Sequence, residues 1–189
     1  MKHKNKKFII HPLTVAFYLI TIAFSDPKIA LCALFCSTIH ELGHYFSAVV
    51  LGYSIKSFIL YPFGAEMKLC GFTSYKKDIT VSLFGPVMNI VAALVGCVFN
   101  IGNFFIIYNI TLAVLNLLPI NHLDGGNVMA SLLMLICDPD RAERVVSIIS
   151  FLILLITWII SVYIFMMLGG SPSLFFICIM LFASTFLRE

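Results

Sequence analysis

Long apolar runs, separated by short polar segments, make up most of the chain. A membrane-spanning helix needs roughly 20 apolar residues, and six runs come near or above that length: residues 8–24, 29–51, 79–99, 104–118, 145–168 and 173–187. A seventh run, residues 128–137, is too short to cross alone, and we expect a half-span or an interfacial helix there. The pattern predicts an all-α integral membrane protein with about six transmembrane helices.

The segment between the second and third runs has a different period. Pro62 to Gly64 form a turn signal, and residues 65–69 alternate apolar and polar side chains. Alternation of this kind is the period of a β-strand. We therefore expect a β-hairpin between spans 2 and 3.

Composition agrees with a membrane protein in one domain. Of the 189 residues, 61% are hydrophobic and 11% are charged, whereas about a quarter of the residues in soluble globular proteins are charged. No repeat stands out and no soluble domain is expected after the last span, so residues 1–189 are interpreted as a single membrane domain. The 6 cysteines lie mostly inside apolar runs without a CxxC pair, which favours packing over a disulfide framework.

The lysines and arginines orient the predicted spans. If the amino terminus is cytoplasmic, six spans place all of the 12 lysines and arginines except Lys28 on the cytoplasmic side, as the positive-inside rule predicts. Both termini are then cytoplasmic, and the net charge of +3 reflects topology, not binding to nucleic acid. A signal peptide ending near "AFSDP" is the alternative for the first run, and its removal would not change the orientation of the later spans.

The second apolar run contains "IHELGH", residues 39–44, although ionisable side chains are costly in a bilayer and by default mark a functional site there. Residues four apart on a helix are offset by about 40° in projection, so His40 and His44 face one direction with Glu41 beside them. A catalytic zinc takes three protein ligands, often imidazole nitrogens, and one water. A lone buried histidine is more often a hydrogen-bonded core residue, but HExxH in an apolar span favours one Zn²⁺ per chain.

A third zinc ligand is expected at the end of a span. "NLLPINHLDGGNV", residues 116–128, places Asp124 just after the fourth span, on the cytoplasmic side that the second half of span 2 also approaches. His122 and Cys36 are the alternatives. We rank Asp124 above His122, and His122 above Cys36, because a cysteine one turn before His40 would face the metal poorly and suits packing better.

Three motifs resemble, in their order, the signatures of the site-2 proteases, a family of intramembrane zinc metalloproteases (peptidase family M50). They are "HELGH" in the second span, "FGPVMN" at residues 84–89 and "NLLPINHLDGG" after the fourth span. The wording around them looks most like the stage IV sporulation protein FB branch of endospore-forming bacteria, over nearly the whole chain. The resemblance implies that the hairpin is membrane-re-entrant. We expect no C-terminal CBS-type (cystathionine-beta-synthase) domain, which this branch often carries, because the sequence stops at Glu189.

The resemblance implies a role for each matching residue. His40, His44 and Asp124 would bind zinc, and Glu41 would be the general base that takes a proton from zinc-activated water. Asn89 and Asn116 would hold substrate or stabilise the oxyanion. Interhelical hydrogen bonding is the alternative for both asparagines.

The expected function is hydrolysis of a peptide bond in or near a transmembrane segment of a membrane-anchored protein substrate. In this branch the substrate would be a sporulation pro-sigma factor, in the bacterial cytoplasmic or forespore-surrounding membrane. A regulatory or inhibitory membrane partner and the oligomeric state stay open.

A non-catalytic zinc-binding membrane protein or a transporter is the alternative function. A transporter would line a path with several polar residues across its spans, whereas the external halves of these spans have few. Membrane metalloproteases that use a glutamate as third ligand are a closer alternative, but no later span contains a suitable glutamate.

Overall fold

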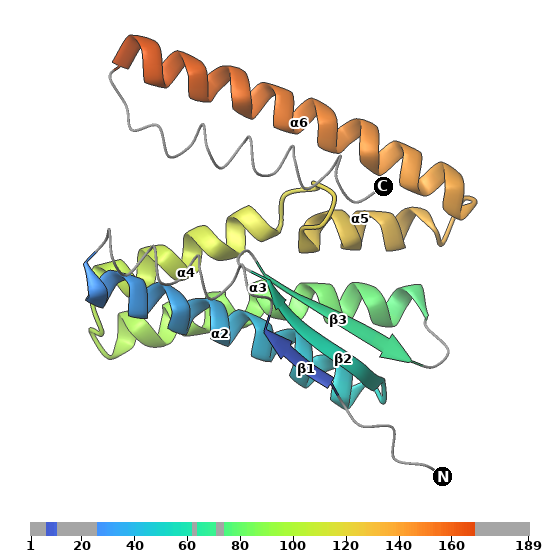
Figure 1. Ribbon diagram of the computed structural model, residues 1–189, viewed down its shortest axis with the longest axis horizontal. Coiled ribbons are helices and arrows are strands. Elements are labelled where there is room, and N and C mark those ends of the chain that lie inside the picture. The colour runs from blue at the N-terminus through green and yellow to red at the C-terminus, as the bar shows by residue number, and fades with distance from the viewer. Residues whose placement is uncertain (1–6, 11–25, 62–63, 71–73, 169–189) are drawn as a thin grey trace. The chain divides into compact units, whose positions relative to one another are not determined.

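The computed structural model describes residues 7–10, 26–61, 64–70 and 74–168. The chain divides into two compact units, Met1–Asn116 and Leu117–Glu189, which are described separately. The described chain is mostly helical, in agreement with the expected class, and the first unit adds a small sheet (Figure 1). Residues 11–24 of the first predicted span and the whole sixth predicted span, 173–187, lie outside the described residues.

Three helices form the body of the first unit: α2 (Pro27–Val50), α3 (Tyr75–Val98) and α4 (Asn103–Asn116). α2 begins at Pro27 because the Asp26 carboxylate accepts a 2.9 Å hydrogen bond from the Lys28 amide and proline fits the first helical position. α3 packs against both α2 and α4. The three helices lie within a few residues of the predicted runs 29–51, 79–99 and 104–118.

α2 and α3 approach closely at the glycine of the HELGH motif. A Cβ atom on Gly43 would lie 2.6 Å from the Phe84 carbonyl oxygen and 3.1 Å from the Gly85 Cα. Small residues at such crossings let two helix backbones pack at short distance within a membrane. Gly43 therefore sets the spacing at which the two flanking histidines meet α3.

A three-stranded sheet contacts α2 in the first unit (Figure 1). β2 (Ser54–Tyr61) and β3 (Gly64–Cys70) pair antiparallel, with Ile59 opposite Glu66, so the predicted hairpin is confirmed. β1 (Lys7–Ile10) pairs parallel with β2, and the strand order is β1-β2-β3. Re-entry of this hairpin into a membrane stays a prediction.

The helix expected from residue 8 is wrong at its start, because β1 occupies Lys7–Ile10. Phe8, Ile9 and Ile10 are aromatic and β-branched residues, which favour strands. Pairing with β2 also gives their backbone groups hydrogen-bond partners. A short apolar run does not by itself distinguish a strand from a helix, so the all-α expectation holds for most of the described chain but not for the sheet.

The second unit contains α5 (Asp124–Leu133) and α6 (Pro139–Leu168), which pack against each other. α6 begins six residues before the predicted run 145–168, and α5 begins four residues before the predicted run 128–137. The additional residues at the start of each helix are polar or glycine-rich, so a search for apolar runs does not include them.

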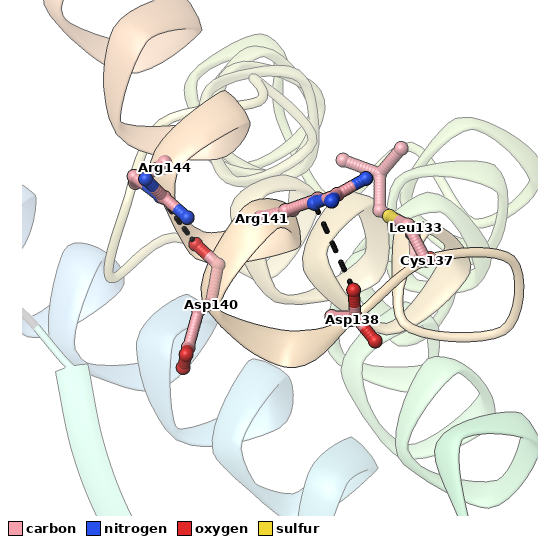
Figure 2. A network of polar contacts seen from close by, with 6 residues as sticks. All are labelled: Leu133, Cys137, Asp138, Asp140, Arg141 and Arg144. Atoms are coloured by element: carbon pink, nitrogen blue, oxygen red, sulfur yellow. Dashed lines mark hydrogen bonds and ion pairs between the residues drawn. The ribbon is translucent and has the colours of Figure 1, made fainter.

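The turn between α5 and α6 is exposed and charged. The Asp138 carbonyl accepts a 3.0 Å hydrogen bond from the Arg141 amide, and Pro139 takes the first helical position of α6. Figure 2 shows the side chains of this turn: the Arg141 guanidinium lies 3.7 Å from the Asp138 carboxylate, and Arg144 Nε donates to the Asp140 carbonyl at 3.1 Å. Exposed pairs of this kind contribute little to stability.

Two described helices are long and apolar enough to cross a membrane, α3 and residues Pro139–Met167 of α6. α4 is apolar but shorter, and α2 interrupts its apolar sequence with Lys28 and the HELGH motif. Large apolar side chains are exposed on the first unit, among them Phe46 at 60% and Leu94 at 61%. An exposed apolar surface of this kind suits contact with lipid, and the six-span topology stays a prediction.

Polar contacts close the base of the hairpin. Tyr53, directly before β2, is buried, and its hydroxyl donates a 2.6 Å hydrogen bond to the Asp78 carboxylate on α3. The Ser74 amide, which follows β3, donates to the same hydroxyl at 3.5 Å. Lys77 Nζ donates to the Leu51 carbonyl at 3.0 Å and lies 5.7 Å from the centre of the Tyr53 ring. The end of α2 and the start of α3 are thereby joined at the point where the hairpin leaves them.

We expect the stability of the folded chain to fall at alkaline pH through Tyr53. Burial, and next the hydrogen bond to Asp78, raise the pKa of Tyr53 above its ordinary value of 10.0. The stabilisation is complete below the unfolded pKa of about 10 and is lost as the pH rises through the higher folded pKa. Tyr53→Phe should therefore flatten the fall in melting temperature above about pH 10, and should cost about 1 kcal/mol at neutral pH.

Thermal unfolding of the full chain in detergent micelles measures both effects. Tyr75→Phe, which removes an exposed phenol at the start of α3, should keep the wild-type profile. An unchanged alkaline profile in Tyr53→Phe would contradict the prediction.

Candidate metal centre

His40 and His44 meet on one face of α2, as the HExxH spacing predicts. Their Nε2 atoms lie 3.1 Å apart, and their rings meet edge to face with centroids 4.7 Å apart. His40 is buried, with 5% of its surface exposed, and His44 is half-buried. The pair therefore forms a compact two-nitrogen donor set inside the first unit.

The outer nitrogen of each ring contacts an acceptor on α3. His44 Nδ1 lies 2.8 Å from the Val81 carbonyl oxygen, and His40 Nδ1 lies 3.0 Å from Asn89 Oδ1. Carbonyl and amide oxygens only accept hydrogen bonds, so both Nδ1 atoms carry the proton and donate. Both Nε2 atoms then present lone pairs, which is the tautomer that a metal-binding histidine needs.

Two lone pairs 3.1 Å apart repel each other unless a cation lies between them. Zinc binds imidazole nitrogen at about 2.0–2.1 Å, so one ion can reach both Nε2 atoms at this separation. The Nδ1 atom of each ring already donates a hydrogen bond to the protein, and such a bond fixes the orientation of histidine ligands at metal sites. The donor set of His40 and His44 therefore fits a zinc ion.

Gly85, in the GPVMN element of α3, makes room for the two rings. A Cβ atom there would overlap the His44 imidazole and would lie 2.9 Å from His40 Cε1. Pro86, which follows it, is also buried. A glycine at this position is thus required by the rings on the neighbouring helix and not by a special backbone conformation.

Glu41 follows His40 on α2 and is half-buried. It precedes His44 by three positions, and residues three apart are neighbours on a helix surface. Glu41 thus lies on the same part of α2 as the imidazole pair, and its role as general base stays a prediction.

Asp124 lies in the second unit, as the first residue of α5, and is half-buried. The glycines after it pack on backbone: a Cβ atom on Gly125 would overlap the Leu117 carbonyl, and one on Gly126 would overlap the Ile120 carbonyl. These contacts hold the first turn of α5 against the preceding loop. The sequence "LDGG" thus fixes where the Asp124 backbone sits within its unit.

Two serines on α6 hold the loop that leads to Asp124. The Asn121 amide donates a 2.8 Å hydrogen bond to Ser150 Oγ, and the Asn121 side chain donates to Ser147 Oγ at 3.1 Å. Ser150 is fully buried. Sequence analysis missed both serines, because a single serine in an apolar run has no distinctive spacing.

The two alternative ligands have other surroundings. His122 is exposed and has a positive φ of 70°. Cys36 is fully buried and accepts a 3.1 Å hydrogen bond from Asn109 Nδ2, which agrees with the packing role expected for it.

The amide groups of the two predicted asparagines are engaged inside the protein. Asn89 is fully buried, contacts His40 through Oδ1 and donates from Nδ2 to Asn109 Oδ1 at 3.1 Å. Asn116 Nδ2 donates to the Leu112 carbonyl one turn earlier on α4, at 2.9 Å. These contacts match the interhelical alternative for Asn89, and the oxyanion role stays a prediction for both residues. Asn109 was missed, and its one signal is a polar residue within the apolar run 104–118.

Two sequence comparisons match parts of the chain. A model of peptidase family M50 matches residues 96–157, a segment that begins after the HELGH motif. Stage IV sporulation protein FB of Bacillus subtilis (strain 168) is 30% identical over 168 residues, which are 82% of this chain and 58% of that protein. The chain thus spans 58% of the length of this relative.

The fold is similar to a solved membrane protease. The site-2 protease from Methanocaldococcus jannaschii matches with a TM-score of 0.69 and 16% sequence identity, over 98% of this chain and 91% of that chain. At this identity the likeness concerns the fold, and it includes a mostly helical architecture.

We expect Gly85→Ala to weaken zinc binding by displacing the His44 ring, with zinc affinity at least about tenfold lower. Gly96→Ala is the matched control, because a Cβ there would meet the Phe105 side chain 2.9 Å away on α4 and no histidine. Metal analysis of the purified variants after dialysis against zinc measures the difference. Full zinc content in Gly85→Ala would refute the assigned packing of the two rings against α3.

Proposed function

Because this chain belongs to the site-2 protease family, peptidase family M50, we propose that it is an intramembrane zinc metalloprotease. It hydrolyses a peptide bond in or near a transmembrane segment of a membrane-anchored protein. The imidazole pair carries this proposal: the two Nε2 atoms face each other at 3.1 Å, and each Nδ1 contacts an acceptor on α3.

Three residues bind one zinc ion in this proposal. His40 and His44 each offer an imidazole nitrogen, and Asp124 offers a carboxylate oxygen as third ligand. Two histidines and one carboxylate are a common ligand set for catalytic zinc. Asp124 is favoured over His122 because His122 is exposed, and over Cys36 because Asn109 already donates to the Cys36 sulfur.

The protein groups then divide the proton transfers of peptide hydrolysis. Bound zinc supplies a Lewis acid that polarises the scissile carbonyl and activates the attacking water. Glu41 accepts the proton from that water and donates it to the leaving amine nitrogen. Asn89 holds His40 in place, and Asn116 is our remaining candidate for a donor to the substrate or the oxyanion.

The edge of the sheet provides a way to hold an unwound substrate. A helical substrate hides its carbonyl groups in its own hydrogen bonds, and unwinding it in lipid leaves costly unpaired groups. Within the described strands, β1 and β3 cover the two edges of β2, and each of them pairs with β2 alone. We assign the outer edge of β3 to the substrate, which adds to the sheet as a further strand.

The membrane topology and the substrate of this activity are taken from the sequence analysis. We propose that residues 1–189 are one membrane protease domain with six spans, a re-entrant hairpin and cytoplasmic termini. Through the likeness to stage IV sporulation protein FB, a sporulation pro-sigma factor in the membrane around the forespore is the first substrate to test. A membrane protein that regulates or inhibits the enzyme is compatible with this setting.

We expect Glu41→Gln to keep zinc and lose cleavage, whereas Asp124→Asn loses both. Removing the general base lowers the rate by at least about 100-fold, while removing a ligand lowers zinc affinity. Zinc content and cleavage of a single-span substrate are measured with purified protein in lipid. If wild type binds zinc but the cleavage measured is the same in wild type and Glu41→Gln, that cleavage does not depend on Glu41, the proposed catalytic role of the centre is refuted, and a zinc-binding or transport role takes its place.

We expect proline substitutions at successive positions of residues 65–69 in β3 to differ alternately in their effects on cleavage and on hairpin stability. Successive amides of an edge strand point toward β2 and away from it. A proline at an outward amide should lower cleavage at least about tenfold with zinc content unchanged, while one at an inward amide should also destabilise the hairpin.

The matched control is alanine at the same position, for example Met67→Ala beside Met67→Pro, since alanine keeps the amide. Cleavage and zinc content are measured together for each variant. Parallel loss of zinc and cleavage at every position would point to misfolding and would remove β3 as the substrate edge.

A further inference from the structure

A chain of buried amides runs from the metal centre to α4. His40 Nδ1 contacts Asn89 Oδ1 at 3.0 Å, and Asn89 Nδ2 donates to Asn109 Oδ1 at 3.1 Å. Both asparagines have 0% of their surface exposed. The chain therefore connects α2, α3 and α4, and each link reaches the next without solvent exposure.

The side-chain amide of Asn109 has a fixed orientation because it donates to a backbone carbonyl. Its Nδ2 donates to the Phe105 carbonyl at 2.9 Å and to Cys36 Sγ at 3.1 Å. A backbone carbonyl accepts hydrogen bonds and cannot donate. If the Asn109 amide were reversed, its oxygen would face the Phe105 oxygen in an apolar interior, which is costly.

The orientation of the Asn109 amide determines that of the Asn89 amide and, through it, the tautomer of His40. Because Asn109 presents oxygen to Asn89, Asn89 must turn its nitrogen toward Asn109 and its oxygen toward His40. His40 must then carry its proton on Nδ1. If both asparagine amides were reversed, that proton would move to Nε2, the atom that faces His44, and would block metal binding there.

We propose that Asn109 is a positioning residue for the metal centre, which fixes the tautomer of His40 through Asn89. The zinc part of this role rests on the proposed function. His44 needs no such chain, because its Nδ1 contacts the Val81 backbone carbonyl directly. The two ligands thus differ: the tautomer of His40 depends on two asparagine side chains, and that of His44 depends on backbone alone.

The zinc-free full chain tests this role by nuclear magnetic resonance. Protein labelled with ¹⁵N-histidine in lipid nanodiscs, at about pH 8.5 where imidazoles are generally neutral, reports which ring nitrogen carries the proton. Spectra of His40→Gln and His44→Gln assign the two rings. Zinc affinity of each variant is measured in parallel by competition with a chelating dye.

In Asn109→Leu, which is apolar and of similar shape, Asn89 is free to reverse. We expect His40 to change from the Nδ1–H tautomer to a mixture, while the His44 signals stay as in wild type. Zinc affinity should fall about threefold to tenfold, because part of the population no longer presents the His40 lone pair. His44 serves as an internal control for correct packing of α2 on α3.

Cys36→Ala is the matched control within the same contacts. It removes one acceptor of Asn109 Nδ2 and leaves the Phe105 carbonyl, so the His40 tautomer should stay as in wild type. An unchanged His40 tautomer in Asn109→Leu would overturn the proposal. Simultaneous changes at His40 and His44 would also overturn it, since they would show a general packing role for Asn109.

The readout is separate from proteolysis. A wild-type chain that cleaves no substrate and binds no zinc would refute the proposed function, while the tautomers of the zinc-free rings would still decide the role of Asn109. Conversely, active enzyme with an unaltered His40 in Asn109→Leu would refute the positioning role alone.

Discussion

Polar groups inside an apolar helix bundle must find their partners within the protein, because lipid provides none. This constraint shapes the first unit around its two imidazoles. His40 and His44 each need an acceptor for one nitrogen, and α3 provides both, at Asn89 and at the Val81 carbonyl. The helix can do so only at short range, which requires glycines at the crossing of α2 and α3, Gly43 on one helix and Gly85 on the other.

The sheet follows from the same constraint. Its strands contain backbone groups that need partners, and the central strand β2 is paired on both of its edges. The base of the hairpin is closed by buried Tyr53 and its hydrogen bond to Asp78, so the strands leave the helices at a fixed point. Among the described strands β1 and β3 are both edge strands, and we assign the substrate to the outer edge of β3, since strand addition requires an edge strand.

Much of the described fold could be predicted from the sequence, because α2, α3 and α6 coincide with long apolar runs and the hairpin with a change of period. The start of the first run could not, since Phe8 to Ile10 are apolar in either a strand or a helix and the choice depends on pairing with β2. The residues His40, Glu41 and His44 were found because charge and imidazole are rare in an apolar span. Asn109 was missed because one asparagine in a span is a weak signal, and its meaning depends on a contact with a different helix.

The hydrogen-bond acceptors of the two histidines also explain which parts of the candidate metal centre can be recognised in the sequence. His44 is held by a backbone carbonyl, and many side chains at Val81 would present the same oxygen. Its support is therefore invisible in any motif. His40 is held by the side chain of Asn89, whose orientation depends on Asn109, so its support requires particular residues on two helices. A polar residue placed on a neighbouring span can thus belong to a metal centre without touching the metal, when a one-way chain of donors and acceptors connects it to a ligand.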